Sequence, residues 1–197
     1  MISEKSNTEP IKRFTSKGVF PHQFAFTLLI PLRNIFLSPE KLIKRLELKE
    51  DHTVLEIGPG PGYYSLNVAR KLPKGKLVLA DIQEEMLNYS KKRLDKKGIR
   101  NVEYKICDGQ KLDFNDESFD RVFMVTVIGE VEHKEAYIKE IYRILKKGGM
   151  LSISELAGDP DKMSIGEIEE LVGICNFRLK NQFGNSKNYT VNFEKLY

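Results

Sequence analysis

Residues 54–65, VLEIGPGPGYYS, form the densest group of residues whose types and spacing could do chemistry. Glu56 comes shortly before three alternate glycines, Gly58, Gly60 and Gly62, and the segment is typical of a strand that turns into a helix. Glycines at such a turn allow backbone angles that are closed to other residues, and they let a ligand lie against bare backbone. The helix start adds unpaired N–H groups and positive potential. The segment therefore predicts a ligand-binding turn.

Two kinds of ligand use a turn of this type, and the glycine spacing favours one of them. A dinucleotide fingerprint is G-x-G-x-x-G, with the pyrophosphate on the helix end. Here the third glycine comes one place early, and Tyr63 stands where the fingerprint requires glycine. The acidic Glu56 also suits a pyrophosphate poorly, whereas it suits a cationic group such as the α-ammonium of a methionine moiety. We therefore expect a cationic ligand at this turn.

Two further carboxylates follow the next two predicted strands. Asp81 ends the second strand, and Asp108-Gly109 follow the third. Ligands of open α/β sheets lie outside the carboxyl ends of the strands, where Asp81 can accept both ribose hydroxyls of either NAD or S-adenosylmethionine. Each feature alone has a plainer explanation, because an Asp after a strand is often a helix cap. Their order and spacing together predict one cationic ligand that carries hydroxyl and amino groups.

The elements that must position these residues alternate between strands and helices. We expect strands over 53–57, 76–81, 101–106, 119–128 and 150–155. We expect helices over 62–72, 84–97 and 133–146, and from the capping box of Ser164 and Glu167 to about Cys175. This repetition predicts an α/β fold with a Rossmann-like, doubly wound and mostly parallel sheet.

The end of the chain departs from that repetition. Residues 177–183 and 188–196 are typical of two strands, and only the four residues GNSK join them. This link is too short for a crossover helix, so the two strands must pair antiparallel. The sheet is therefore expected to finish with a C-terminal hairpin.

One domain in two parts accounts for the chain. Residues 49–197 are expected to form the core, which leaves no insertion to build a binding site for a second substrate. Residues 1–48 are therefore expected to form an N-terminal arm and a helical lid. Within this part, Ser38 and Pro39 are typical of the start of a helix.

Composition excludes several classes of protein. With 41% hydrophobic and 30% charged residues, the chain is expected to fold into a globular protein. The net charge of +4 is interspersed and too small to indicate a nucleic-acid partner. Cys107 and Cys175 have no metal-ligand spacing, so we expect no metal, a reduced cytoplasmic setting, and two buried, inert thiols.

No segment is long enough to cross a bilayer. The longest apolar stretch covers residues 25–32, well below the roughly 20 residues that a span needs. A peripheral membrane contact stays open, because Phe24, Phe26, Leu28 and Leu29 could dip into a membrane interface.

From about residue 50 to 197, the chain resembles the class I S-adenosylmethionine-dependent methyltransferases. Within this class, the chain most resembles the type 11 group, which is similar to ubiquinone/menaquinone-biosynthesis methyltransferases. The likeness rests on four segments: VLEIGPGPGYYS, LVLADIQEEML, VEYKICDGQKLDFNDESFDRVFMV and EIYRILKKGGMLSISE. It implies an enzyme that uses S-adenosyl-L-methionine as cofactor and methylates a small molecule. The aromatic residues of the lid would suit an apolar or aromatic acceptor, or they could simply pack on the sheet.

The resemblance also implies which residues bind the methyl donor. The methionine part would be held by Glu56 and by the backbone of Gly58, Gly60 and Gly62. The ribose and the adenine would be held by Asp81, Ile82, Asp108 and Gly109. Two residues at the end of the fourth strand, Thr126 and Val127, would line the site. The chain departs from the family at Gly129-Glu130, where relatives often carry His or Asn, so the acceptor stays undetermined.

The catalytic residues are not determined by the sequence. A general base is needed only if the acceptor loses a proton. His22 in the lid and His133 at a helix start are the candidates, although His133 could equally be an exposed surface residue. His52 is expected to be exposed in a charged turn. Tyr63 and Tyr64 could shape the pocket or simply pack.

Two alternative functions remain open at this stage. One is an NAD-dependent oxidoreductase, against which the glycine spacing and Glu56 argue. The other is a non-catalytic module that binds S-adenosylmethionine. The acceptor atom and the oligomeric state are also undetermined.

Overall fold

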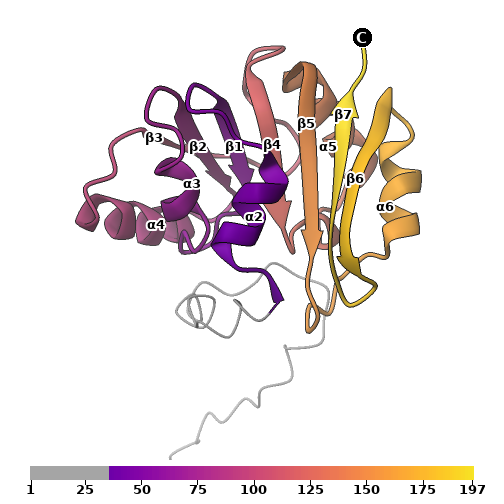
Figure 1. The fold of residues 1–197 in the computed structure, drawn as a ribbon, viewed down its shortest axis with the longest axis horizontal. Coiled ribbons are helices and arrows are strands. Elements are labelled where there is room, and N and C mark those ends of the chain that lie inside the picture. Colours follow the sequence, from indigo (N-terminus) through magenta and orange to yellow (C-terminus); the bar gives the residue numbers. More distant parts are fainter. Residues whose placement is uncertain (1–35) are drawn as a thin grey trace, which may run out of the picture.

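The computed structural model describes residues 36–197 of the chain. These residues form one seven-stranded sheet with the order β3-β2-β1-β4-β5-β7-β6 (Figure 1). The strands are β1 (Thr53–Ile57), β2 (Lys76–Asp81), β3 (Val102–Ile106), β4 (Phe119–Val125), β5 (Leu145–Glu155), β6 (Phe177–Asn185) and β7 (Asn188–Lys195). Strands β1 to β5 pair in parallel, whereas β7 pairs antiparallel with β5 and β6. The predicted doubly wound sheet with its terminal hairpin is therefore confirmed.

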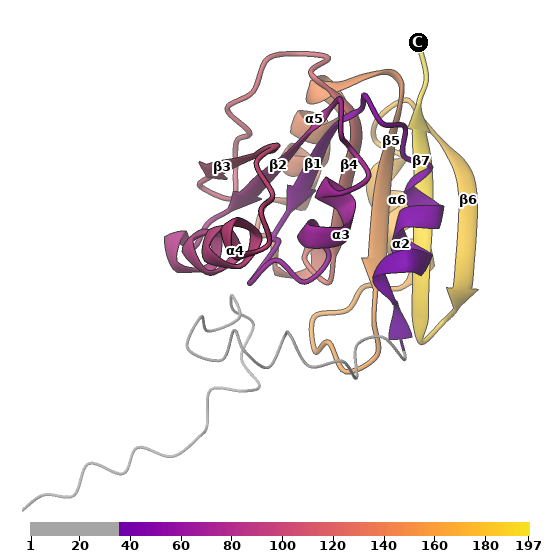
Figure 2. The same ribbon diagram turned by 60° about the vertical axis from the view of Figure 1, so that its left-hand side comes forward.

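Helices cover both faces of the sheet (Figures 1 and 2). Helices α2 (Pro39–Leu46), α3 (Ser65–Ala69) and α4 (Glu84–Lys96) lie on one face, and α5 (Lys134–Ile144) and α6 (Ile165–Val172) lie on the other. Successive side chains of a strand point to opposite faces of the sheet, so each strand contributes residues to two apolar cores. In β1, for example, Val54 packs in the core beneath α2 and α3, and Leu55 packs in the core beneath α5 and α6.

Helix α2 is fastened to the sheet at both of its ends. At its start, the Ser38 side chain caps the helix, and the Tyr64 hydroxyl donates to the Leu37 carbonyl at 3.0 Å. At its end, the buried Arg121 guanidinium donates to the Leu46 carbonyl at 3.0 Å, which satisfies a carbonyl that the helix leaves unpaired. Because Tyr64 follows the carboxyl end of β1 and Arg121 belongs to the amino end of β4, the described chain begins at the carboxyl edge of the sheet.

Several expected element boundaries were wrong, each for a local reason. The helix expected from Gly62 begins only at Ser65, because the glycine turn continues to Tyr64. The strand expected to reach residue 128 ends at Val125, because Thr126 adopts a positive φ of 55°.

The helix expected over 133–146 ends at Ile144, and β5 begins at Leu145 rather than at residue 150. Leu145 pairs with Phe119 of β4, before an irregularity in the register. Strand β5 therefore begins ahead of Gly148 and Gly149, which were expected to separate the helix from the strand.

Two expectations fall wholly or partly outside the described residues. Most of the predicted arm and lid, including His22, belongs to residues 1–35, and so do the candidates for a membrane contact, Phe24, Phe26, Leu28 and Leu29. The helix that starts at Ser38 and Pro39 is the described part of that segment. Within residues 36–197, no helix has both the length and the apolar character that a membrane crossing requires.

Candidate functional site

The glycine turn after β1 has the backbone that its sequence predicts. Gly58, Gly60 and Gly62 have φ values of +64°, +54° and +77°, a region that favours glycine. Space is limited as well: a Cβ on Gly58 would lie 2.5 Å from a methyl carbon of Val127, and a Cβ on Gly62 would lie 2.9 Å from Cβ of Ser90. Gly58 and Gly62 are therefore required for both conformation and packing, and Gly58 and Gly60 are partly exposed at the carboxyl edge.

Glu56 is a buried carboxyl group next to this turn. Its side chain is only 3% exposed, and the Ser65 hydroxyl at the start of α3 donates to its Oε2 at 2.6 Å. Burial raises the pKa of Glu56 to about 8, and the nearby Asp81 adds to that rise, whereas the Ser65 hydrogen bond opposes it. A buried carboxyl of this kind favours the arrival of a cation, which would stabilise its charged form.

Asp81, the last residue of β2, joins the second strand to the glycine turn. Its Oδ1 accepts a hydrogen bond from the Gln83 backbone N–H at 3.0 Å. Burial raises the pKa of Asp81, and hydrogen bonds from the backbone N–H groups of Gln83, Gly60 and Ile82 counteract that rise. Glu56 and Asp81 thus lie on the same side of the sheet edge, each held by hydrogen bonds within the protein.

Asp108 reaches the same edge from the loop after β3, but it is exposed. Its Oδ1 accepts hydrogen bonds from the backbone N–H groups of Gln110 and Lys111, both at 2.8 Å, and these bonds lower its pKa. The plainer explanation, a carboxylate that caps a turn, thus describes part of its role. Gly109 has a φ of +75°, and a Cβ there would lie 3.5 Å from a methyl carbon of Ile82, which is 43% exposed.

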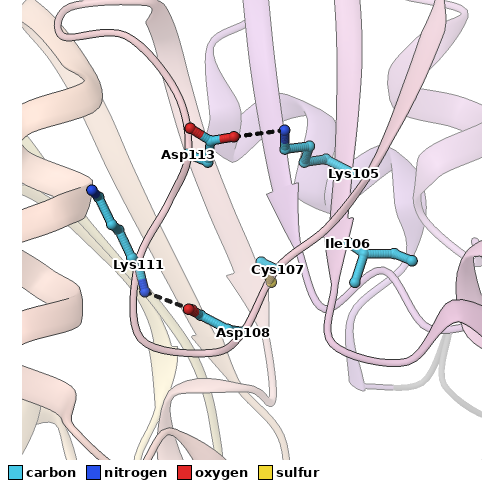
Figure 3. A pocket seen from close by; sticks show the side chains of 6 residues that line it. All are labelled: Lys105, Ile106, Cys107, Asp108, Lys111 and Asp113. Atoms are coloured by element: carbon cyan, nitrogen blue, oxygen red, sulfur yellow. Dashed lines mark hydrogen bonds and ion pairs between the residues drawn. The ribbon is translucent and has the colours of Figure 1, made fainter.

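A cavity of about 520 Å³ lies beside Asp108, at the end of β3 (Figure 3). It is lined by Lys105, Ile106, Cys107, Asp108, Lys111 and Asp113. One wall is held by the ion pair of Lys105 and Asp113, whose nitrogen and oxygen are 2.9 Å apart. The lining of the cavity thus consists of the apolar Ile106, of Cys107 and of four charged side chains.

The two cysteines do not behave as fully buried residues. Cys107 and Cys175 are both free and half-buried, so the expected burial was only partly right. Burial raises the pKa of each thiol, so both stay protonated near neutral pH. Reduced reactivity is the consequence, since the thiolate is the nucleophile.

The end of β4 turns sharply towards the glycine turn. Thr126 has a φ of +55°, which is rare for a β-branched residue, and it is held there by two hydrogen bonds. Its N–H donates to the Ser154 carbonyl at 2.8 Å, and its Oγ1 donates to the Val125 carbonyl at 2.7 Å. The turn brings Val127 against Gly58, so the ends of β4 and β1 are in direct contact.

Gly129 belongs to the short helix η2 (Ile128–Glu130), where the chain departs from the family pattern. A Cβ on Gly129 would lie 1.9 Å from the backbone oxygen of Asp161. The loop between β5 and α6 therefore packs directly on this glycine. Its presence has a packing reason, which a family motif at the end of β4 does not reveal.

Glu155, the last residue of β5, is a buried carboxyl at the same edge of the sheet that sequence reasoning did not single out. The side chain is 0% exposed, and neither of its carboxyl oxygens has a hydrogen-bond partner in the described structure. Burial, followed by the charge of Asp159, raises its pKa to about 8. The only signal in the sequence is an acidic residue that closes the apolar segment MLSISE.

The other candidate side chains lie as follows. His133 is exposed and directly precedes α5, as one alternative held. His52 was expected to be exposed, but it is only 7% exposed: its Nδ1 accepts from the Lys49 N–H at 3.2 Å, just before β1 and far from the carboxyl edge. Tyr63 and Tyr64 are buried and pack edge to face with ring centres 4.9 Å apart, which supports the packing explanation.

Comparison with known proteins gives a consistent result. Residues 48–186 match the family model described as a methyltransferase domain. The ubiquinone/menaquinone biosynthesis C-methyltransferase UbiE of Pseudomonas putida is 36% identical over 118 residues, which is 59% of this chain and 46% of that protein. The chain thus matches somewhat less than half the length of this curated relative.

Solved structures share the same architecture. A SAM-dependent methyltransferase from Aquifex aeolicus has a TM-score of 0.84 and 26% identity, and the match covers 90% of this chain and 100% of that one. The [4+2]-cyclase SpnF has a TM-score of 0.71 at 16% identity, covering 80% of this chain and 79% of that one. The second likeness shows the fold alone.

Proposed function

Because the chain belongs to the methyltransferase domain family, the class I S-adenosylmethionine-dependent methyltransferases, we propose that it methylates a hydroxylated aromatic ring of the quinol type. The methyl donor of this class is S-adenosyl-L-methionine. The acceptor is proposed from the curated relatives, which are C-methyltransferases of ubiquinone/menaquinone biosynthesis. Neither the family nor the fold supports the nicotinamide alternative.

One observation carries the donor assignment: a buried carboxyl, Glu56, lies beside a glycine turn in which Gly58 and Gly60 are partly exposed. S-adenosylmethionine, when bound, supplies a methyl group activated on a sulfonium and presents an α-ammonium. We assign that ammonium to Glu56, with the backbone of Gly58, Gly60 and Gly62 against the methionine chain. The raised pKa of Glu56 supports this assignment, because a carboxyl that resists ionisation alone gains most from a cationic partner.

The remaining donor contacts are proposed along the same edge. Asp81 would accept the ribose hydroxyls with the oxygen capacity that its backbone bonds leave. The adenine would lie between Ile82 and the loop of Asp108 and Gly109, next to the cavity at the end of β3 (Figure 3). The exposed, apolar Ile82 supports this, since it offers a flat ligand an apolar contact.

The carboxyl edge of the sheet divides into two regions. The donor half comprises the carboxyl ends of β1, β2 and β3, with Glu56, Asp81 and Asp108. The acceptor half comprises the carboxyl ends of β4 and β5, with Thr126 and Glu155. Val127 lies between the halves because it contacts Gly58, and we propose that Thr126 and Val127 line the reacting end of the donor.

We also propose that the N-terminal segment of residues 1–48 covers the acceptor half with its part before α2, because α2 itself packs in the core. The described chain begins at the carboxyl edge, where Leu37 is bound by Tyr64, so the preceding residues start from the correct edge of the sheet. Deleting residues 1–35 should lower turnover at least tenfold while the melting temperature of the core changes little. Unchanged turnover would show that the segment is no lid. The general-base candidate His22 belongs to this segment, and His133 remains the candidate near the start of α5.

Methyl transfer itself provides the test of function. Full-length protein would be incubated with isotopically labelled S-adenosylmethionine and with 1,4-naphthoquinol or benzoquinol kept reduced by dithionite. Label in the ring is the expected result. Binding of S-adenosylhomocysteine without any transfer would favour a non-catalytic binding module or another acceptor, and binding of NADH alone would contradict the donor assignment. The cytoplasmic location and the absence of a nucleic-acid partner stay predictions.

A further inference from the structure

Glu155 lies at the carboxyl end of β5, in the acceptor half, and β4 separates it from β1 of the donor half. Its neighbour Ser154 accepts the backbone hydrogen bond of Thr126, so Glu155 comes one residue after the last bridge between β5 and β4. On β5, Leu151 and Ile153 pack in the core beneath α5 and α6, and alternation places Glu155 on the same face. Val127, which contacts the glycine turn, packs against that core as well.

The carboxyl group of Glu155 is fully buried, and neither of its oxygens has a hydrogen-bond partner of ordinary geometry in the described residues. The backbone N–H of Met163 acts on it only as a weak donor, which lowers the pKa of Glu155 by less than the surrounding charges and burial change it. Buried polar groups are nearly always hydrogen-bonded, so an orphaned carboxyl calls for an explanation. Glu56 provides the contrast, since it is buried to a similar degree but accepts a hydrogen bond from Ser65. The protein therefore satisfies the buried carboxyl of the donor half and leaves that of the acceptor half unsatisfied.

Charged groups around Glu155 do not neutralise it. Asp159 of the β5–α6 loop and Glu130 of η2 disfavour its charged form, whereas Lys162 favours it. The Lys162 ammonium, however, donates to the backbone oxygens of Ser186 and Lys187 in the terminal hairpin. From β7, Tyr189 faces Glu155 across the strand pair, and its hydroxyl donates to the Met163 carbonyl instead.

A second unfavourable feature lies beside it. Thr126, on the neighbouring strand end, is a β-branched residue at positive φ. Conformations of this kind persist where the surrounding structure enforces them, and they cluster at active sites. The acceptor half thus combines backbone strain and an unsatisfied carboxyl within one pair of strand ends.

We propose that Glu155 is the proton acceptor for the acceptor substrate, taking the proton that the ring loses when it is methylated, either directly or through one water. This inference rests on the proposed function. The ring carbon forms a bond to the methyl carbon, and the bond from that carbon to sulfur breaks with its electron pair on sulfur. The proton of the ring passes to the Glu155 carboxylate and from there to solvent, so the reaction releases one proton per methyl group.

The raised pKa of Glu155, about 8, suits this role. A general base works best when its pKa lies near the operating pH. Below pH 8 only a fraction of the protein carries the ionised base, so kcat at saturating donor should rise about tenfold per pH unit towards pH 8 and then level off.

The substitution Glu155→Gln tests this assignment with full-length protein and 1,4-naphthoquinol as acceptor. At pH 8 kcat should fall by roughly 100-fold or more, and the rise of kcat between pH 6 and pH 8 should disappear. The dissociation constant of S-adenosylhomocysteine should stay within about threefold, because the donor half has its own carboxyls.

Thermal unfolding gives a readout that does not depend on turnover. A carboxyl whose pKa is raised by folding is protonated in the folded protein up to about pH 8, whereas the unfolded chain ionises near pH 4.5, so its cost appears as pH rises between these values. Near pH 4.5, Glu155→Gln should therefore have the same melting temperature as wild type. As the pH rises towards 8, the melting temperature of Glu155→Gln should exceed that of wild type by a growing margin.

Ser152→Ala is the matched control, because the Ser152 hydroxyl is also buried and without a partner, on the same strand but on the other face. It should keep wild-type kcat and its pH profile. Unchanged kcat in Glu155→Gln would overturn the proposal, and so would a parallel loss of donor affinity. If wild type binds S-adenosylhomocysteine but methylates neither quinol, the acceptor class and the role of Glu155 fall together; if it does not bind, the proposed function itself is wrong.

Discussion

The donor half and the acceptor half are built on adjacent strands of one sheet, yet they differ in how their polar groups are satisfied. In the donor half, Glu56 accepts from Ser65, and Asp81 accepts from the backbone of the next turn. In the acceptor half, Glu155 has no partner in the described structure and Thr126 is strained. A donor that a whole family shares can be bound by a site whose polar groups are already hydrogen-bonded within the protein. In the acceptor half, we propose that the substrate is the missing partner of Glu155.

A substitution in the glycine turn is expected to have the largest effect on stability of the changes that test this difference between the halves. Gly62→Ala forces a side chain into positive φ and towards Cβ of Ser90, so it should lower the free energy of unfolding by about 2–4 kcal/mol. Gly98→Ala is the matched control, since Gly98 has a φ of +72° with nothing near its Cβ position, and about 1 kcal/mol is expected. Denaturant titration measures both. Equal losses would mean that the donor half is not tightly packed.

A substitution of Thr126, the strained residue of the acceptor half, is expected to change stability by a smaller amount and in the opposite direction. Thr126→Gly relieves a positive φ of 55°, so it should raise the free energy of unfolding by about 0.5–1 kcal/mol while kcat falls. Glu117→Gly is its control, because Glu117 has a φ of 50° in an exposed turn, and it should stabilise without changing kcat. If Thr126→Gly keeps full turnover, the strain has no part in the reaction.

The glycine turn and the strand-end positions of Glu56 and Asp81 could be predicted from the sequence because they depend on local patterns. Gly58, Gly60 and Gly62 show their purpose in their spacing, and Glu56 and Asp81 belong to strands whose apolar patterns are unambiguous. The parallel sheet followed from the alternation of strands and helices, and the terminal hairpin followed from a link too short for a helix. These features need no knowledge of tertiary contacts.

The acceptor half could not be predicted because it depends on contacts between distant segments. Thr126 turns away from β4 only because Ser154 of β5 holds its N–H, and nothing in the apolar run 119–128 reveals that. Gly129 is required by the backbone of Asp161, some thirty residues later. Glu155 became visible only when its burial and lack of partners were known. His52 was misjudged for the same reason, since a turn encloses it.

The central claim is that the Glu56 carboxyl binds the ammonium of the donor, and proton release on binding tests it most directly. Calorimetric titration of the full chain with S-adenosylhomocysteine at pH 7, in buffers of different ionisation enthalpy, counts the protons exchanged. Because the pKa of free Glu56 is about 8 and a cation lowers it, wild type should release close to one proton, and its affinity should rise between pH 6 and pH 8. Glu56→Gln should bind roughly 10–150-fold more weakly and release none. Tight binding by Glu56→Gln with the same proton release, or no binding by wild type at all, would contradict the account.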